Sequence, residues 1–308
     1  PAAAVAVETS LAGGDAPTGG MPVQGLRGCV VEDVVDPNPV RRDVPAPRAP
    51  FFGSKLLDRL PLKSVVAYLN ETALFRVQWQ VKHKGSTPAE YERLLDTEFR
   101  PKLRALVQEC DQGGLVLPQA VYGYYPCAAD GDRLLVYDPA AENVIETFEF
   151  PRQRAQRRLC LSDYFRPFGT GPLDVVAFTA VTVGSRATEE CKKLFAANRY
   201  QDYLYLHGFS VEAAEATAEF LHARIRAELG VAEEDAATPA ELVKQRYRGR
   251  RYSPGYPACP RLEDQEKIFR LLRPERIGLS LTEEWQLEPE QSTTAIVVHH
   301  PQAVYYST

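Results

Sequence analysis

The spacing of apolar residues predicts one long helix in the second half of the chain. Apolar side chains recur every three or four residues, which is the period of a helix that buries one face. They are Val211, Ala214, Ala218, Leu221 and Ile225, and we expect a helix from about Val211 to Leu229 that ends at Gly230. The polar positions between them form a stripe, and from its place on this stripe Glu215 is expected to be exposed. This stripe consists of Glu212, Glu215, Glu219, His222 and Arg226.

Two Thr-Pro-Ala-Glu sequences predict further helix starts. In each, the threonine can cap the helix, the proline suits the first helical position and the glutamate completes a capping box. The first, Thr87–Glu90, opens a helix to about Cys110 that Gly113-Gly114 closes, and the second, Thr238–Glu241, opens a short helix. A further helix is expected over Leu262–Leu272.

Apolar and β-branched runs predict five strands, the first of them after the turn signal Asp130-Gly131-Asp132. They are Arg133–Tyr137, Val144–Phe150, Val175–Val183, Ile277–Leu281 and Thr294–His299. Helices occur in clusters and strands neighbour strands along the chain. This order favours an α+β fold, namely a single mixed domain with a mainly antiparallel sheet flanked by helices.

Composition divides the chain near residue 45. Residues 1–45 are rich in Ala, Gly, Pro and Asp, and prolines continue to Pro50, so we interpret this part as an extended linker. Residues 46–308 have the pattern of a globular domain. The first residue is not Met, and we expect the chain to be a piece of a longer protein.

Charge and cysteine content exclude several classes. The net charge of −5 argues against nucleic acid as a partner. No apolar run reaches the roughly 18 residues needed to span a bilayer, and Pro1–Val7 lacks the basic start of a signal peptide. The six cysteines are scattered without C-x-x-C spacing, which argues against a zinc site and predicts reduced thiols in a cytoplasmic protein.

The search for catalytic side chains finds none. His299-His300 are neighbours in a predicted strand and would point to opposite faces, so they are not expected to share a metal ion. No Ser or Cys has the context of an activated nucleophile, and Glu283-Glu284 is typical of surface charge. We therefore predict neither a catalytic side chain nor a metal site.

The segment Arg251–Pro260 stands out. Its three prolines, glycine and two tyrosines exclude a helix interior and indicate a rigid loop. Gly255 would let a ligand approach the backbone, and Arg251 offers a planar fork for a carboxylate. These features suit a small amphoteric ligand with a flat ring. The preceding run of Arg246, Arg248 and Arg250 is either a solvated loop or an edge that docks an anion or acidic protein.

A family resemblance sharpens this interpretation. Arg251, Gly255 and Tyr256–Pro260 resemble the R-x-x-x-G-Y-P-A-C-P motif of the C-terminal, S-adenosylmethionine-binding activation domain of cobalamin-dependent methionine synthase. Further segments resemble that family in the same order, and together they cover about residues 45–308. They are Tyr68–Phe75 followed by Trp79, Tyr124–Ala128, Leu159–Phe165, Asp174–Gly184, Ala214–His222, and His300-Pro301 with Tyr305-Tyr306.

The resemblance implies a function in methyl transfer. The family's activation domain binds S-adenosylmethionine and presents its methyl group to cob(I)alamin after the cobalt has been oxidised to cob(II)alamin and reduced again by flavodoxin or a similar electron donor. The parent enzyme transfers methyl from methyltetrahydrofolate to homocysteine. Since the sulfonium itself is the electrophile, the domain's task is to position the ligand, which agrees with the lack of catalytic side chains.

The resemblance also implies the ligand-binding residues. Arg251 would bind the methionine carboxylate, and the backbone of Gly255, Tyr256 and Ala258 would cradle the adenosyl group. Glu215 would hold a polar or cationic part of the ligand, and Tyr305 and Tyr306 would contact the adenosine or the sulfonium. Asn70 stands where the family commonly has an aspartate, so it would offer the ligand's ammonium only a neutral hydrogen bond.

The chain contains neither the family's D-x-H-x-x-G cobalamin motif nor the zinc cysteines of the homocysteine module. It is therefore expected to be a fragment of a methyltransferase, with the cobalamin-binding domain of the same polypeptide and a flavodoxin-type reductase as partners. Two alternatives stay open. One is a docking module without ligand binding, favoured by Asn70, and the other is a standalone methyltransferase, which the lack of a glycine-rich strand-to-helix turn disfavours.

Overall fold

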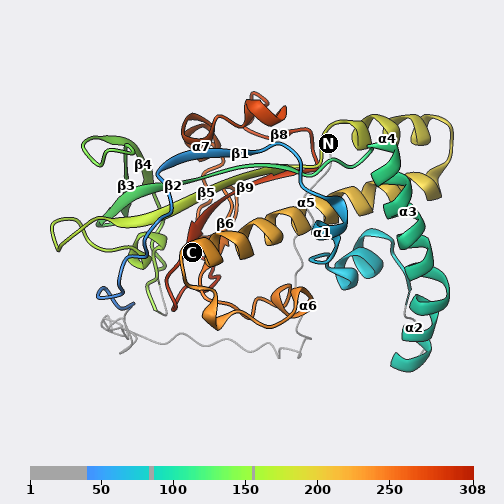
Figure 1. Ribbon diagram of the computed structural model, residues 1–308, viewed down its shortest axis with the longest axis horizontal. Helices are drawn as coiled ribbons and strands as arrows, with labels where there is room; N and C mark the ends of the chain where they lie inside the picture. Colours follow the sequence, from blue (N-terminus) through green and yellow to red (C-terminus); the bar gives the residue numbers. More distant parts are fainter. Residues whose placement is uncertain (1–39, 83–86, 155–156) are drawn as a thin grey trace, which may run out of the picture. The chain divides into compact units, whose positions relative to one another are not determined.

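A seven-stranded antiparallel sheet forms the centre of the structure (Figure 1). The computed structural model describes residues 40–82, 87–154 and 157–308. The strand order is β4-β3-β2-β5-β9-β6, and β1 pairs with the first half of β2 beside β3. The strands are β1 (Gly53–Leu57), β2 (Gln119–Asp130), β3 (Arg133–Tyr137), β4 (Val144–Glu149), β5 (Asp174–Thr182), β6 (Arg250–Tyr252) and β9 (Ser292–Val298).

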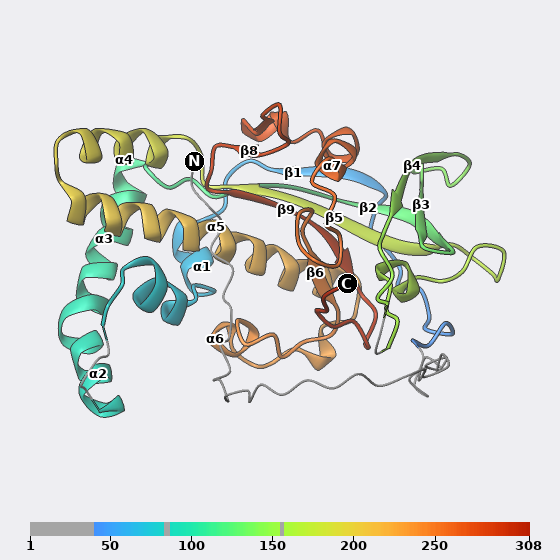
Figure 2. The same cartoon turned by 180° about the vertical axis from the view of Figure 1, so that it is seen from behind.

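Alternate residues of the central strands enter two separate cores, one on each face of the sheet. On β2, Tyr122 and Tyr124 join the core beneath helix α5, whereas Val121 and Tyr125 join the core beneath helix α7. This is the two-residue period of a strand. Because both faces are covered, β2 and β5 are almost completely buried. The helices α5 and α7 lie on opposite sides of the sheet in both views (Figures 1 and 2).

The helices are gathered mainly on the α5 face and at one end of the sheet (Figure 2). They are α1 (Leu62–Val66), α2 (Pro88–Leu94), α3 (Arg100–Gly113), α4 (Arg186–Ala196), α5 (Tyr200–Glu228), α6 (Pro239–Leu242) and α7 (Asp264–Leu272). Two π-helical turns, Ala73–Gln78 and Leu95–Phe99, and three short 3-10 turns, Leu161–Tyr164, Ala232–Glu234 and Pro274–Ile277, complete the helical elements of the described residues. The α+β class and the antiparallel sheet are as predicted.

The predicted starts and ends of helices are confirmed where they depend on hydrogen bonds between residues that are close in the sequence. Thr87 and Glu90 form the full capping box at the start of α2, and Gly114 ends α3 with φ 58°. At Thr238 only half of the expectation holds, because its hydroxyl bonds the Glu241 carboxylate at 3.2 Å but caps no backbone N–H. Gly230 follows α5 as predicted, although α5 begins at Tyr200 rather than near Val211.

Two predicted features are wrong. Residues 277–281 are not one strand, because a 3-10 turn ends at Ile277 and Gly278 takes φ 76°. Only Ser280–Leu281 (β7) is extended, in a small ladder with Leu287–Glu288 (β8). The loop that was expected to begin at Arg251 starts with strand β6. The polar stripe of α5 is mostly buried, at Glu212, Glu219, His222 and Arg226, whereas Glu215 is exposed as expected.

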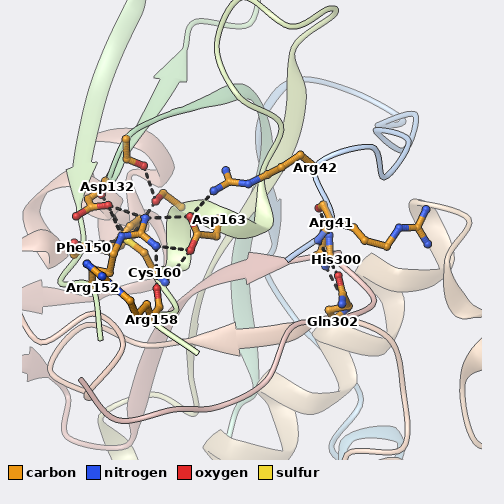
Figure 3. Close-up of polar contacts among 12 residues, drawn as sticks. Arg41, Arg42, Asp132, Phe150, Arg152, Arg158, Cys160, Asp163, His300 and Gln302 are labelled. Carbon is orange, nitrogen blue, oxygen red and sulfur yellow. Dashed lines mark hydrogen bonds and ion pairs between the residues drawn. The ribbon is translucent and has the colours of Figure 1, made fainter. Parts of the chain in front are cut away.

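The first described residues pack onto the domain as a strap, which we define as residues 40–44 (Figure 3). The backbone of Arg41 bonds the side chains of both Gln302 and His300, at 2.8 and 2.9 Å. Arg42 pairs at 2.5 Å with the buried Asp163, which also receives two hydrogen bonds from Arg152. Val40 and Val44 are buried. Most of the predicted linker, residues 1–39, lies outside the described residues, but its last part belongs to the folded domain.

Candidate functional site

A cavity of about 490 Å³ lies on the α5 face at the β6 edge of the sheet. Four separate segments line it: α5, β6 with its following loop, β9 and the C-terminal segment. Six of the eight predicted binding residues are among its lining residues, namely Glu215, Arg251, Tyr256, Ala258, Tyr305 and Tyr306. Sequence reasoning missed other lining residues: Ala218, Tyr252, Ser253, Pro257, Thr293, Ala295 and Ser307.

Strand pairing explains how Arg251 reaches the cavity. It lies opposite Val297 in the β6–β9 ladder, and Val297 belongs to the α5-side core. Side chains alternate along a strand, so Arg251 points toward α5, where its Nη1 pairs with Glu219 Oε2 at 2.8 Å. The Arg251 side chain stays 15% exposed and lines the cavity.

Behind Arg251, the buried stripe of α5 forms a charged network. Arg226 is 2% exposed, places its guanidinium 3.9 Å from the centre of the Tyr247 ring and bonds both oxygens of Asp235 at 2.8 and 2.9 Å. Glu219 receives hydrogen bonds from both Arg251 and Tyr247. Burial, and then the neighbouring arginines, lower the pKa of His222 well below its usual range, so this histidine is neutral. The network fixes Glu219, and through it Arg251.

The loop after β6 has a different use for its glycine than the sequence suggested. Gly255 takes φ 93°, which L-residues with a side chain rarely adopt. Its N–H bonds the Cys259 carbonyl at 2.9 Å and closes the turn. Gly255 is not among the residues that line the cavity. The turn requires a glycine at position 255, and this turn places Tyr256 and Ala258 at the cavity.

Tyrosines form the aromatic wall of the cavity. Tyr305 packs edge-on against Tyr252 with ring centres 5.6 Å apart, and the Tyr252 hydroxyl bonds the Val304 carbonyl at 2.7 Å. Tyr256 is 67% exposed at the rim. The Tyr306 hydroxyl is buried and has no hydrogen-bond partner among the described residues. The wall therefore offers flat rings to a ligand, whereas the Tyr306 hydroxyl is buried against the α7-side core.

Asn70 lines a second cavity of about 270 Å³ rather than the first. Arg251 and Glu215 line both cavities, which are therefore adjacent. The Asn70 side chain accepts a hydrogen bond from the Ala73 N–H at 3.1 Å, as a helix-capping residue does. The structure thus brings all the predicted binding residues except Gly255 to one connected site.

The basic run before β6 does not form one charged surface. Arg248 donates to the His299 carbonyl at 2.8 Å, and Arg250 donates to the carbonyls of Tyr247 and Gly249. Only Arg246 of this run is exposed. Two of the three arginines of the expected docking edge, Arg248 and Arg250, are therefore engaged in hydrogen bonds within the domain.

The remaining candidates have structural partners. His299 bonds Asp174 at 2.8 Å, whereas His300 bonds the backbone of Arg41, so the two histidines serve different contacts. The described cysteines, at positions 110, 127, 160, 191 and 259, are free and buried. Within the described ranges no cluster of His, Cys, Asp and Glu could hold a metal ion, and no helix there is both long and apolar enough to cross a bilayer.

Comparison with known proteins decides the family. Residues 61–308 match the family model described as the activation domain of vitamin B12 dependent methionine synthase. The chain belongs to this family. It is 40% identical over 289 residues to methionine synthase of Mycobacterium tuberculosis and 39% identical over 280 residues to that of Mycobacterium leprae. These matches cover 89% and 86% of the chain but 24% and 23% of the relatives, so the chain spans about a quarter of their length.

The fold is shared with a solved member of the family. A crystal structure of the MetH reactivation domain bound to AdoHcy is 26% identical, with a TM-score of 0.76. The similarity covers 86% of this chain and 84% of that one. The expected fold, an activation domain with an antiparallel sheet and flanking helices, is confirmed.

Proposed function

We propose that this chain binds S-adenosylmethionine and presents its methyl group to cob(I)alamin, as the activation domain of a cobalamin-dependent methionine synthase. The observation that carries the proposal is the cavity at β6, in which Arg251, Glu215 and the tyrosines converge. Membership of the family and the AdoHcy named for the solved relative support it. The remaining modules of the enzyme, which acts on methyltetrahydrofolate and homocysteine, would lie elsewhere in the full-length polypeptide.

The residues fit this ligand part by part. The guanidinium of Arg251 would bind the carboxylate through charge-assisted hydrogen bonds. The rings of Tyr252, Tyr305 and Tyr306 would pack on the adenine and attract the sulfonium. Cobalamin, bound by a neighbouring domain, would supply the nucleophilic metal, and a flavodoxin-type donor would supply the electron. This chain would contribute orientation of the methyl donor.

Calorimetric titration of the chain with S-adenosylmethionine tests the proposal. We expect saturable binding that Arg251→Ala weakens by about 1.5–3 kcal/mol, because a hydrogen bond to a charged group is lost. Arg251→Lys should fall between the two, since it keeps the charge but not the fork. Arg246→Ala is the matched control, because Arg246 is exposed and lines neither cavity.

Two outcomes would contradict the proposal. A folded wild-type chain that binds no S-adenosylmethionine would favour the docking module, which contacts the cobalamin domain or the reductase without a ligand of its own. An Arg251→Ala variant that binds as tightly as wild type would place the ligand elsewhere. Thermal unfolding of each variant identifies any loss that comes from misfolding.

A further inference from the structure

The second cavity carries more negative than positive charge. Three glutamates of α5 line it: Glu212, Glu215 and Glu219. The single cationic residue among its lining side chains is Arg251, and that guanidinium is already paired with Glu219. The excess of carboxylate over cation makes the cavity suited to a cationic group.

One buried oxygen beside this cavity lacks a partner. Glu219 is 7% exposed, and its Oε1 has no hydrogen-bond partner among the described residues. Arg226 Nη1 lies 3.9 Å from this oxygen, beyond hydrogen-bond distance. A buried carboxylate oxygen without a bond is costly, so the described residues compensate the charge of Glu219 only in part.

Glu212 is the carboxylate with the least compensation. It is 6% exposed, and the contact found for it is a hydrogen bond from Gln78 Nε2 at 3.2 Å. Burial, opposed by that bond and reinforced by Glu215, raises the pKa of Glu212 to about 7. An ammonium group placed between Glu212 and Glu215 would relieve both the burial cost and their repulsion.

We propose that Glu212 is the carboxylate that receives the primary ammonium group of the ligand, in the cavity that Asn70 also lines. This inference rests on the proposed function. In an amino acid the ammonium and the carboxylate are attached to the same carbon, and Arg251 and Glu215 line both cavities. A methionine moiety whose carboxylate lies at Arg251 can therefore direct its ammonium into the second cavity. Asn70 lines the same cavity as a neutral partner, and Glu212 provides the charge that Asn70 lacks.

Two ligands that lack charged groups of S-adenosylmethionine test the assignment: one lacks the carboxylate alone, and the other lacks the whole amino acid part and the sulfonium charge. Glu212→Gln should weaken S-adenosylmethionine binding about tenfold or more, the loss expected for a charge-assisted hydrogen bond. The same weakening should persist with decarboxylated S-adenosylmethionine, which keeps the amine, and should vanish with methylthioadenosine, which has no amino acid part. Arg251→Ala should show the opposite pattern with the decarboxylated ligand, because the carboxylate it would bind is missing.

A rescue experiment separates binding from folding. Asn70→Asp in the Glu212→Gln background restores a carboxylate to the cavity and keeps an oxygen for the Ala73 N–H, so affinity should recover by most of the lost factor. Glu233→Gln, at an exposed position outside both cavities, is the control for net charge.

The outcomes are distinguishable. No binding of S-adenosylmethionine by wild type would overturn the proposed function itself. Binding that Arg251→Ala weakens but Glu212→Gln leaves unchanged would overturn only the role of Glu212. A Glu212→Gln loss that is equally large for methylthioadenosine would also overturn it, because the effect would then not depend on the ammonium.

Discussion

Single glutamates of α5 differ sharply in what surrounds them. Burial acts against the charge of Glu228, but hydrogen bonds from Arg224, Tyr124 and Tyr122 outweigh it and lower its pKa. Glu212 has only the amide of Gln78 against the same burial, so its pKa is raised. Glu228 is thus compensated for stability, whereas Glu212 retains a cost in the folded chain. Such uncompensated groups in cavities are typical of binding sites.

The burial of the poorly compensated Glu212 carboxylate predicts that the free energy of unfolding depends on pH. Its pKa in the folded chain, about 7, exceeds the ordinary 4.5, so the folded state binds its proton more tightly than the unfolded state. The contribution of this group to the free energy of unfolding is therefore fully present below pH 4.5. It is lost as the pH rises to about 7, and the total loss is about 3 kcal/mol. Glu212→Gln should remove this loss. In urea unfolding, its gain over wild type should be about 2–3 kcal/mol larger at pH 8 than at pH 5.

The control and the contrary result are both simple to recognise. Glu233→Gln, at an exposed position, should change stability equally at the two pH values. A gain for Glu212→Gln that does not depend on pH would show that the carboxyl titrates normally. Together with the binding experiment, the prediction describes a residue whose removal stabilises the fold and weakens the ligand.

Among the elements, the short strand β6 has a large influence on the site relative to its length. It has three residues, pairs on one side with β9 and carries Arg251 at its centre. The chain approaches β6 through Gly249, which takes φ 81°. A Cβ at this position would lie 2.3 Å from the Val298 carbonyl oxygen. The backbone of β9 thus leaves room only for glycine at the entry to the strand.

Gly249→Ala should therefore separate the start of β6 from β9. We expect a loss of unfolding free energy of more than about 2 kcal/mol, from the strained φ and the collision with backbone. S-adenosylmethionine affinity should fall as well, because Arg251 loses its register opposite Val297. Thermal unfolding and calorimetric titration measure the two effects.

Gly131→Ala is the matched control for the backbone strain. Gly131 also has a positive φ, of 60°, but a Cβ there would meet nothing within 4 Å. This variant should lose only about 1 kcal/mol of stability and none of its affinity. Equal losses in the two variants would mean that the contact with β9 contributes nothing at Gly249.

Across the whole molecule, what the sequence predicts depends on how local its cause is. The capping box at Thr87 and the end of α3 at Gly114 follow from bonds within a few residues, and both are found. Strand β2 was not predicted, because cores on both faces remove the alternation that marks a half-buried strand. The polar stripe of α5 has the period of a surface helix, but most of it is buried, because Arg251 and the Arg226–Asp235 pair cover it.

At the site, too, what the sequence predicts depends on whether the cause is local or involves distant segments. Arg251, Glu215 and the tyrosine pair were predicted through the family motif, since their convergence depends on segments far apart in the chain. Glu212 lies outside the segments that resemble the family, and Glu219 lies within Ala214–His222 but has no expected role there. Only the packing of α5 against β6 and the segment of Asn70 reveals what these two glutamates contact. A helix stripe of several acids followed by His and Arg, as at positions 212–226, was the available signal.

The strap predicts where the domain begins. Composition places the boundary at residue 45, but residues 40–44 bond His300, Gln302 and Asp163 (Figure 3). The chain from His300 leads directly to Tyr305 and Tyr306 at the cavity. A chain that starts at residue 46 should therefore be less stable than one that starts at residue 40. The two buried valines alone account for about 3 kcal/mol, an upper estimate because the unfolded chain is itself partly compact.

The same truncation should also weaken the binding of the ligand. Without the strap, His300 and Gln302 lose their bonds to the Arg41 backbone, and the C-terminal segment that carries the tyrosine pair gains freedom. Ordering that segment again on binding would cost affinity for S-adenosylmethionine. Urea unfolding and calorimetric titration of the two chains measure both effects. If stability and affinity are the same in both, the domain begins at residue 46 as the composition predicts; if both are lower in the shorter chain, the strap is part of the site's support.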